Sequence, residues 1–466
     1  MDKDKKDNRV PGVLIAAPSS GSGKTTFTTG LMAALKEKGH RVYGYKCGPD
    51  FIDPMYYTGV LGVPCRNLDT WFTGEEKTRE LFMEGTGTGG IRIVEGVMGL
   101  YDGAAGTERE GSSYDLARTL GLPVILVVNA RGMGRSAVAL IKGFCDMDTG
   151  NLIKGIFLNN TAETLYRRLK PLIESETGCS CLGFLSRNEK LLLPERHLGL
   201  VTPAGREEAY AAFAAAAGES IGNALDWDKF YEISGYLSDM TASEEESILP
   251  EKEERPDSVL LAVARDEAFC FLYEDNLREL KKAGAELCFF SPIRDKRLPE
   301  GISGLLLSGG YPELYAEELS GNRELMEDIR RSVRAGLPTV AECGGFMYLQ
   351  ESIFTFEGKE YPMVGALPGI SASKGHPVRF GYVEVREKEP AFLPEGTGLR
   401  GHEFHYYDST ENGDSCSLTK PVTGKSREGI VTTSTLWAGF PHIYYPAEPV
   451  FAETFVSKMR EYSRQH

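Results

Sequence analysis

Short runs of β-branched and aliphatic residues recur along the first half of the chain and alternate with longer amphipathic stretches. The runs are GVLIAA, RVYGYK, IRIVEG, PVILVVN and LIKGIFLNN. Continuous apolar runs of this length predict strands buried on both faces, as in a parallel sheet covered by helices. The pattern therefore predicts a doubly wound α/β domain.

The same alternation restarts after an acidic segment. Residues 239–257 are rich in Glu, Ser and Pro and have no sustained apolar period, which predicts a solvated linker, with an acidic binding tail as the alternative. Because 466 residues exceed the size of a single core, we expect two domains. The first covers residues 1–238, and the second, also doubly wound α/β, covers residues 258–466.

Charge and cysteine usage exclude several classes of partner. The chain has 52 Lys plus Arg against 67 Asp plus Glu, a net charge of -15, which argues against nucleic acid. Its nine cysteines are scattered and form no CxxC pair, as expected of reduced thiols in the cytoplasm. No apolar run approaches the roughly 18 residues of a membrane span. We expect a cytoplasmic protein without a membrane partner.

The stretch PSSGSGKTT directly follows the first apolar run and precedes a helical pattern. Gly21 and Gly23 let backbone N–H groups close around phosphate, Lys24 can reach the terminal phosphates, and Thr25 can hold Mg²⁺. With Thr26, these residues predict a site for ATP. A Gly/Ser turn without a ligand is the plain alternative.

Two positions in this loop depart from related patterns. Pro18 stands where the full phosphate-loop pattern has glycine, and Ser19 stands where one group of ATPases has an extra lysine. The missing lysine makes the loop more similar to the dethiobiotin-synthetase-type ligases, which activate a carboxylate. It is less similar to partitioning ATPases.

Four acidic residues follow predicted strands, at the edge where open α/β sheets bind ligands. Asp50 and Asp53 lie in KCGPDFIDP, and Glu95 and Asp102 lie in IRIVEGVMGLYDG. Mg²⁺ takes oxygen ligands and keeps several waters, so one or two carboxylates with Thr25 would complete a site. Glu95 is the first choice and Asp50 the second. Turn capping is the alternative for each Asp.

In the second half, PTVAECGGFMYL places Cys343 between a predicted strand and a predicted helix. Flanked by Gly344 and Gly345, this is the layout of a nucleophile elbow, in which a helix N-terminus activates the thiol. The backbone N–H groups of Gly309 and Gly310 are available for an oxyanion. The alternative is a small residue in a tight turn.

A base is also needed, and spacing does not select it. His402 and His405 could form a metal pair, but no Cys or third His lies nearby. The histidines of this half are His376, His402, His405, His442 and His466.

The assembled motifs resemble those of the glutamine-dependent cobyrinate a,c-diamide synthase family over nearly the whole chain. They are APSSGSGKTT, KCGPDFIDP, EGVMGLYDG, SGGYPE, AECGGFMYL and GHEFHYY. The resemblance implies an N-terminal dethiobiotin-synthetase-like ATP domain and a C-terminal class I glutamine amidotransferase-like domain. It also implies that His442, in GFPHIYYP, is the base for Cys343.

The implied reaction consumes ATP with Mg²⁺ and L-glutamine. ATP would phosphorylate the a and c acetate carboxylates of cobyrinic acid in cobalamin biosynthesis, and ammonia from glutamine would displace the phosphate. By resemblance Lys46 contacts phosphate, Asp102 lies near the reacting carboxylate, and GHEFHYY lines the tetrapyrrole site between the domains. A homodimer is a further expectation. The implied substrate residues are Asp50, Asp53, His402, His405 and Tyr406.

Two residues depart from the family pattern. Tyr444 replaces the second His of the family's HxH ending, at a position where class I amidotransferases with a full triad have Glu. His442 would therefore act with Cys343 without an obvious orienting carboxylate. Asn129 stands where relatives often have Asp. The competing hypotheses are a nickel sirohydrochlorin a,c-diamide synthase of the coenzyme F430 route and a non-catalytic, nucleotide-dependent scaffold. Intact Cys343 and His442 argue against the scaffold.

Overall fold

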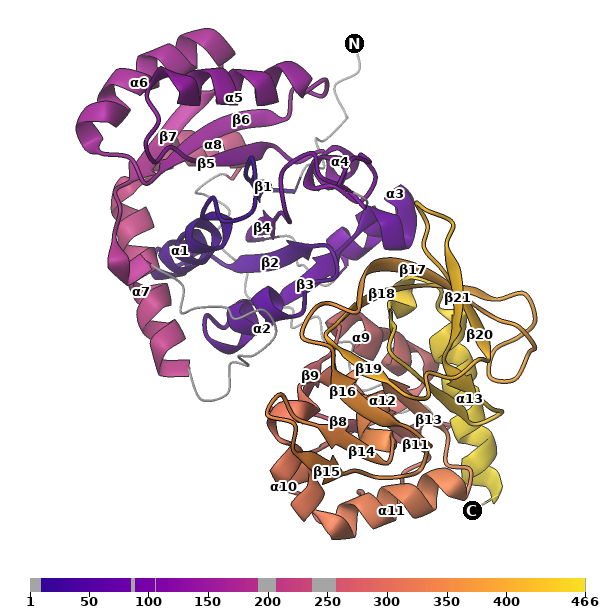
Figure 1. Cartoon of the computed structure of the whole chain (residues 1–466). Helices are drawn as coiled ribbons and strands as arrows, with labels where there is room; N and C mark the ends of the chain where they lie inside the picture. Colours follow the sequence, from indigo (N-terminus) through magenta and orange to yellow (C-terminus); the bar gives the residue numbers. More distant parts are fainter. Residues whose placement is uncertain (1–9, 85–88, 105, 192–206, 237–256, 466) are drawn as a thin grey trace. The chain divides into compact units, whose positions relative to one another are not determined.

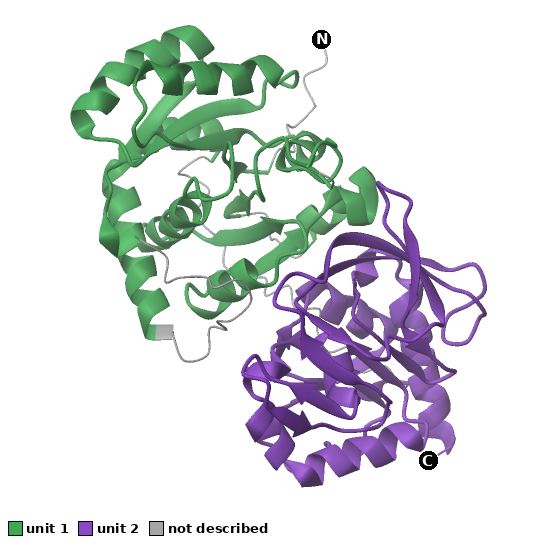
Figure 2. Cartoon of the chain, viewed as in Figure 1, with its two compact units in different colours: residues 1–196, 205–251 green, residues 197–204, 252–466 purple. Residues whose placement is uncertain are grey.

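The computed structural model describes residues 10–84, 89–104, 106–191, 207–236 and 257–465 (Figure 1). These residues form two compact units (Figure 2). Unit 1 contains the described residues up to 236, and unit 2 contains those from 257 onward. The predicted linker, 239–257, lies outside the described residues except for Asp257. No helix in the described part of the chain has the length and apolar character needed to cross a membrane.

Unit 1 is built on a seven-stranded sheet in the order β3-β2-β4-β1-β5-β6-β7, with every neighbouring pair parallel. Buried residues such as Leu14 and Ile15 point to opposite faces of β1, so both faces are covered. The strands are β1 (Gly12–Ala16), β2 (Val42–Cys47), β3 (Cys65–Leu68), β4 (Ile91–Glu95), β5 (Val124–Asn129), β6 (Ile153–Asn159) and β7 (Ser180–Leu185).

The helices of unit 1 follow the strands along the chain, as in a doubly wound fold (Figure 1). Phe27 and Leu31 of α1 share one apolar core with Phe213 of α7 and Phe230 of α8. The helices are α1 (Lys24–Glu37), α2 (Ile52–Gly59), α3 (Thr70–Met83), α4 (Ser113–Leu120), α5 (Arg135–Met147), α6 (Glu163–Thr177), α7 (Glu207–Ala224) and α8 (Trp227–Ser234), with a 3₁₀ turn at Glu189–Leu191.

The sheet order places the carboxyl ends of β1, β2 and β4 side by side. Lys46 at the end of β2 is in register with Glu95 at the end of β4, and Ile15 of β1 is in register with the same glutamate. The phosphate loop leaves β1 at this edge. Chain segments far apart in sequence therefore converge at one edge of the sheet, where ligands of open α/β sheets bind.

Unit 2 has a six-stranded sheet in the order β10-β8-β11-β13-β23-β22. All neighbours are parallel except the antiparallel pair of β22 and β23. The predicted α/β class of both halves is confirmed. The strands are β8 (Val259–Ala264), β10 (Ala285–Phe290), β11 (Gly304–Leu307), β13 (Thr339–Glu342), β22 (Val431–Thr432) and β23 (Leu436–Gly439), and the helices are α9 (Glu274–Ala283), α10 (Ala316–Gly321), α11 (Arg323–Arg334), α12 (Gly344–Leu349) and α13 (Val450–Gln465).

Unit 2 also contains smaller sheets that the alternation did not predict. They are a five-stranded sheet β21-β20-β17-β18-β24, a four-stranded sheet β15-β14-β16-β19, and the pair β12-β9. GHEFHYY begins on β18. Their strands are β9 (Phe269–Phe271), β12 (Gly309–Gly310), β14 (Ser352–Phe354), β15 (Glu360–Pro362), β16 (Ile370–Ser373), β17 (Arg379–Glu387), β18 (Gly398–His405), β19 (Tyr407–Ser409), β20 (Cys416–Thr419), β21 (Ser426–Gly429) and β24 (His442–Ile443), with 3₁₀ turns at Pro312–Leu314 and Tyr445–Ala447.

Candidate functional site

The phosphate loop of unit 1 depends on glycine at two positions. Gly21 and Gly23 have φ angles of 74° and 100°, in the left-handed region that side chains disfavour. A Cβ added at Gly23 would lie 2.2 Å from Nδ2 of Asn159, which donates to the carbonyl of Ser22 at 3.0 Å. The loop is therefore closed against β6 by a contact that only glycine permits.

Lys24 lies at the start of α1 and is only 8% exposed. Its Nζ donates to the carbonyl oxygens of Met98 at 2.5 Å and Ser19 at 3.3 Å. Burial, together with the nearby positive charge of Lys46, lowers the pKa of Lys24 to about 8. A phosphate ligand would add the negative charge that favours the ammonium form.

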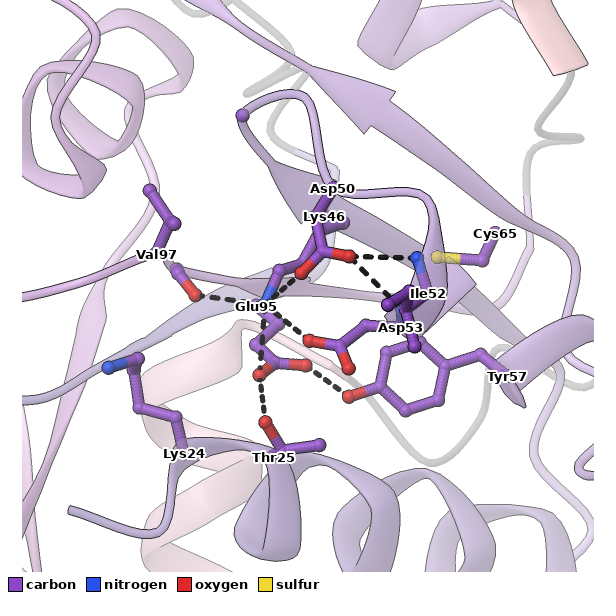
Figure 3. A network of polar contacts seen from close by, with 12 residues as sticks. Lys24, Thr25, Lys46, Asp50, Ile52, Asp53, Tyr57, Cys65, Glu95 and Val97 are labelled. Atoms are coloured by element: carbon purple, nitrogen blue, oxygen red, sulfur yellow. Dashed lines mark hydrogen bonds and ion pairs between the residues drawn. The ribbon is translucent and has the colours of Figure 1, made fainter. Parts of the chain in front are cut away.

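Lys46, Asp53 and Glu95 form a buried charged group, which we call the Lys46 cluster (Figure 3). Lys46 Nζ lies 2.6 Å from Asp53 Oδ2 and 3.1 Å from Glu95 Oε1. Burial alone would lower the pKa of Lys46, but the carboxylates of Asp53 and Glu95 raise it above its ordinary value. The lysine therefore remains a cation at the edge of the sheet.

Glu95 is fully buried and joins the Lys46 cluster to the phosphate loop. Its Oε1 accepts a hydrogen bond from Thr25 Oγ1 at 2.7 Å, and its Oε2 accepts one from the Tyr57 hydroxyl (Figure 3). Burial and the charge of Glu95 raise the pKa of Tyr57 well above its usual range, so this hydroxyl keeps its proton. Sequence reasoning missed Tyr57, although it lies four residues after Asp53 on α2, the spacing of one helix face.

The two other aspartates make local turn contacts. Asp50 Oδ1 accepts from the backbone N–H groups of Ile52 at 2.8 Å and Asp53 at 3.4 Å, while its Oδ2 lies 3.8 Å from Lys46. Asp102 Oδ2 accepts from the N–H of Gly99 at 2.9 Å and lies near enough to Lys24 to influence its pKa. Both therefore cap turns beside the charged groups.

A cavity of about 510 Å³ opens at this edge of unit 1. It brings together every residue of this half that was predicted to bind nucleotide, metal or substrate, apart from Asp102. Asn129 also contributes, and its Oδ1 accepts from the N–H of Arg131 at 3.2 Å and Nδ2 of Asn160 at 3.1 Å. An amide oxygen can serve these donors as an aspartate would. The predicted residues that line the cavity are Gly21, Gly23, Lys24, Thr25, Thr26, Lys46, Asp50, Asp53 and Glu95.

The oxygen atoms of this cavity fit Mg²⁺. Thr25 Oγ1 and Glu95 Oε1 lie 2.7 Å apart, and Asp50, with 29% of its side chain exposed, also lines the cavity. Mg²⁺ usually takes one or two carboxylates and completes its octahedron with waters and phosphate oxygens. Among the described residues, no three His, Cys, Asp or Glu side chains gather into a metal-binding group.

In unit 2 the chain turns sharply at Cys343, between β13 and α12. Cys343 has φ 48° and ψ -106°, strained values for a residue with a side chain, and its N–H donates to the carbonyl of Gly439 at 2.8 Å. A Cβ at Gly345 would lie 2.1 Å from the carbonyl oxygen of Leu307. Glycine after the cysteine is therefore required for α12 to pack against β11.

His442 begins β24 and is buried beside Cys343. Burial alone would lower the pKa of His442, but the charge and hydrogen bond of Cys343, together with Glu342, raise it to about 10. The His442 ring packs on Gly309, since a Cβ there would lie 2.3 Å from Cε1. Gly310, the second predicted oxyanion residue, pairs with Phe269. The structure thus gathers the predicted nucleophile, base and glycines in unit 2.

Tyr444 occupies the position of the missing triad carboxylate, and Glu342 offers a carboxylate near His442 from another position. The buried Tyr444 hydroxyl donates to Asp275 Oδ2 at 3.1 Å. Glu342, directly before the nucleophile, places its Oε2 3.8 Å from His442 Nδ1. Sequence reasoning sought a carboxylate after His442 and missed the one before Cys343, for which adjacency to the nucleophile was the only signal.

GHEFHYY lies beside His442 within unit 2. His402 pairs in register with His442, and burial together with the charge of His442 lowers the pKa of His402 to about 3. His405 stacks on Phe440 with ring centroids 4.1 Å apart, and its Nδ1 lies 2.6 Å from the carbonyl of Tyr407. Tyr406 remains half-buried. The substrate roles of these residues and their place between the domains stay predictions.

Comparisons with known proteins match the two halves of the chain to two different domain families. Residues 13–201 match the CobQ/CobB/MinD/ParA nucleotide binding domain, and residues 261–449 match the CobB/CobQ-like glutamine amidotransferase domain. The chain is 39% identical to a cobyrinate a,c-diamide synthase of Dehalococcoides mccartyi, over 96% of this chain and 97% of that protein. It is 38% identical to the Priestia megaterium synthase, over 96% and 97%, and 37% identical to the Picrophilus torridus synthase, over 96% and 98%. A nucleotide cavity and a Cys-His pair in one chain, with these relatives over 96% of its length, show that the protein belongs to the cobyrinate a,c-diamide synthase family of glutamine-dependent C–N ligases.

Proposed function

We propose that the protein amidates the a and c acetate carboxylates of cobyrinic acid, using ATP and glutamine, in cobalamin biosynthesis. The observation that carries this is one chain that holds both a phosphate-loop cavity beside the Lys46 cluster and a strained Cys343 beside His442. The names of the relatives favour cobyrinate over nickel sirohydrochlorin.

In unit 1 an oxygen of the substrate carboxylate attacks the γ-phosphorus of ATP, and the bond from that phosphorus to ADP breaks. Lys24 and Lys46 stabilise the negative charge on the transferring phosphoryl group, which is the main task of a phosphoryl-transfer site. Thr25, Glu95 and Asp50 would hold Mg²⁺, which neutralises phosphate charge when bound. The product is an acyl phosphate, in which phosphate is a good leaving group. A free carboxylate has no such leaving group.

In unit 2 the Cys343 thiolate attacks the amide carbon of glutamine. The C–N bond breaks, the protonated His442 gives its proton to the leaving nitrogen, and ammonia departs. N–H groups of the Gly309–Gly310 segment would stabilise the oxyanion. Water then attacks the thioester while neutral His442 takes its proton, and the C–S bond breaks. This releases glutamate, with loss of a proton to solvent, and restores the Cys343 thiolate and the His442 imidazolium.

Ammonia next attacks the acyl phosphate, phosphate leaves, and loss of a proton gives the amide. Each amidation consumes one ATP and one glutamine, so two rounds complete the diamide. We place this reaction in the cytoplasm, a proposal that the free state of all nine cysteines supports. The predicted homodimer also stays a proposal, which the molar mass of the protein measured by light scattering would test.

The test is mass spectrometry of cobyrinic acid incubated with the protein, MgATP and glutamine labelled with ¹⁵N at the amide. We expect two successive labelled amides. Cys343→Ala should abolish labelling from glutamine but still form both amides from ammonium. Label on nickel sirohydrochlorin alone would overturn the cobyrinate assignment, and no label on either substrate would overturn the ligase proposal.

A further inference from the structure

The pair of Cys343 and His442 needs a group that holds the imidazole in place. In a nucleophile-base pair, a third residue commonly fixes the ring orientation and stabilises the imidazolium. Tyr444, at the position of the triad carboxylate, instead donates its hydroxyl to Asp275 at 3.1 Å. The position that supplies this carboxylate in a full triad is therefore occupied by a phenol with another partner.

Glu342 precedes Cys343 in the sequence, whereas Tyr444 follows His442. It is the last residue of β13, in register with Gly439 at the end of β23, and β23 leads through two residues into His442. Its Oε1 accepts a hydrogen bond from the N–H of Ile443 at 3.2 Å. Its Oε2 faces His442 Nδ1 at 3.8 Å, an ion-pair separation that is longer than a hydrogen bond.

Because both groups are buried, the contact of the Glu342 carboxylate with His442 matters for the charge of the imidazole. Glu342 is 6% exposed and His442 is 3% exposed, so an imidazolium formed here gains little stabilisation from water. Leaving one member of a buried ion pair without its partner is costly, because the remaining charge keeps its desolvation penalty. Removing the Glu342 charge should therefore favour neutral His442.

Two other titratable groups near His442 are uncharged. His402 lies across from His442 on β18, and its lowered pKa of about 3 keeps it neutral. The Tyr445 phenol has a pKa raised well above its usual range by burial and by Glu342, so it is also neutral. Cys343 is the reacting group, and its charge and hydrogen bond also raise the pKa of His442. Glu342 is the carboxylate that the structure places opposite His442 Nδ1, at 3.8 Å.

We propose that Glu342 is the positioning residue of the amidotransferase site, with its carboxylate holding the His442 imidazolium beside the Cys343 thiolate. The sequence thus supplies from β13 the carboxylate that position 444 lacks. This inference rests on the proposed function, since it assumes that Cys343 and His442 hydrolyse glutamine.

The test compares Glu342→Gln, which removes the charge but keeps an oxygen for the Ile443 N–H, with Glu342→Asp, which keeps a charge. The readout is glutamate release from glutamine as a function of pH by the full-length protein. We expect kcat/KM of Glu342→Gln to fall by about tenfold or more, by analogy with the orienting acid of a triad. We also expect its alkaline limb to shift to lower pH, with both effects smaller in Glu342→Asp.

Two controls separate positioning from folding. Amidation with ammonium bypasses Cys343 and should remain unchanged in Glu342→Gln. Glu279→Gln, which alters another buried carboxylate of unit 2 that pairs with Lys282, should leave the alkaline limb in place. An unshifted alkaline limb with unchanged kcat/KM in Glu342→Gln would overturn the inference. Absence of glutamate release by the unaltered protein would instead overturn the proposed function.

Discussion

At the scale of single residues, each of the two sites contains a charged group that is buried away from water. Glu95 is fully buried yet has three partners, Thr25, Tyr57 and Lys46, so its charge is satisfied before any ligand binds. His442 is held as a cation by Cys343 and Glu342. Each site therefore has its charges and donors arranged in advance, which lowers the reorganisation that the reaction requires.

Tyr57→Phe tests the arrangement around Glu95. The change removes one hydrogen bond to a buried carboxylate, a contact of about 1.5–3 kcal/mol. If that stabilisation is felt in the transition state, kcat for ATP-dependent amidation should fall by about tenfold or more. The assay uses ammonium as nitrogen donor, so that the chemistry of Cys343 and His442 does not contribute, and is repeated over a range of Mg²⁺ concentrations.

Tyr43→Phe is the matched control, because the Tyr43 ring lies near the guanidinium of Arg92 on the same sheet, away from the cavity. It should leave kcat unchanged. Equal rates for Tyr57→Phe and the unaltered protein at every Mg²⁺ concentration would show that the hydroxyl has no part in positioning Glu95.

At the scale of elements, the phosphate-loop helix is fixed by its contact with α7. A Cβ added at Gly30 of α1 would lie 2.5 Å from the Ala217 carbonyl oxygen and 2.6 Å from Ile221 Cγ1. The two helices therefore approach at a distance that only glycine allows. Since α1 carries Lys24 and Thr25 in its first turn, this contact also fixes where those side chains lie.

Gly30→Ala should destabilise unit 1 by about 1–3 kcal/mol, the cost of overpacking a close contact. Gly143→Ala, in the exposed middle of α5, is the opposite case, because an added Cβ meets nothing within 4 Å. It should stabilise unit 1 by about 0.5–1 kcal/mol through helix propensity. Scanning calorimetry measures both, and shifts of equal sign would contradict the assigned contact.

At the scale of the whole molecule, the proposed function assigns ATP-dependent activation to unit 1 and glutamine hydrolysis to unit 2, and the choice of nitrogen donor separates the two. With glutamine, both units must act. With ammonium, the chemistry of Cys343 and His442 is bypassed. Comparison of the two donors therefore isolates the contribution of Cys343 and His442 without any change to the sequence.

This comparison predicts a pH dependence. The pKa of His442 is raised from an ordinary 6.5 to about 10, so the imidazolium persists through neutral pH and is lost only as pH approaches that value. The kcat/KM for glutamine, measured by glutamate release, should therefore hold from about pH 7 to 9 and fall above it. The ammonium reaction should show no loss from this group. A fall of kcat/KM already near pH 6.5–7 would mean that His442 has an ordinary pKa.

Local patterns in the sequence determined much of this protein. Apolar runs predicted the central strands of both parallel sheets, because a strand buried on both faces needs continuous apolar residues. The phosphate loop and the turn at Cys343 could also be recognised from the sequence, since each depends on glycines a few residues apart. For the same reason the nucleotide residues of the phosphate loop could be named before the cavity that joins them was known, whereas Lys46 was named from the family resemblance.

Only the tertiary structure decided which partners those residues have. The hydrogen bond from Ile443 to Glu342 joins positions 101 residues apart, and the contact of Thr25 with Glu95 spans 70. The antiparallel strands that bring His402 beside His442 were equally unpredicted. Periodicity records which face of an element is buried, but not which distant element covers it. The carboxylate for His442 therefore became visible only when sheet order placed β13 next to β23.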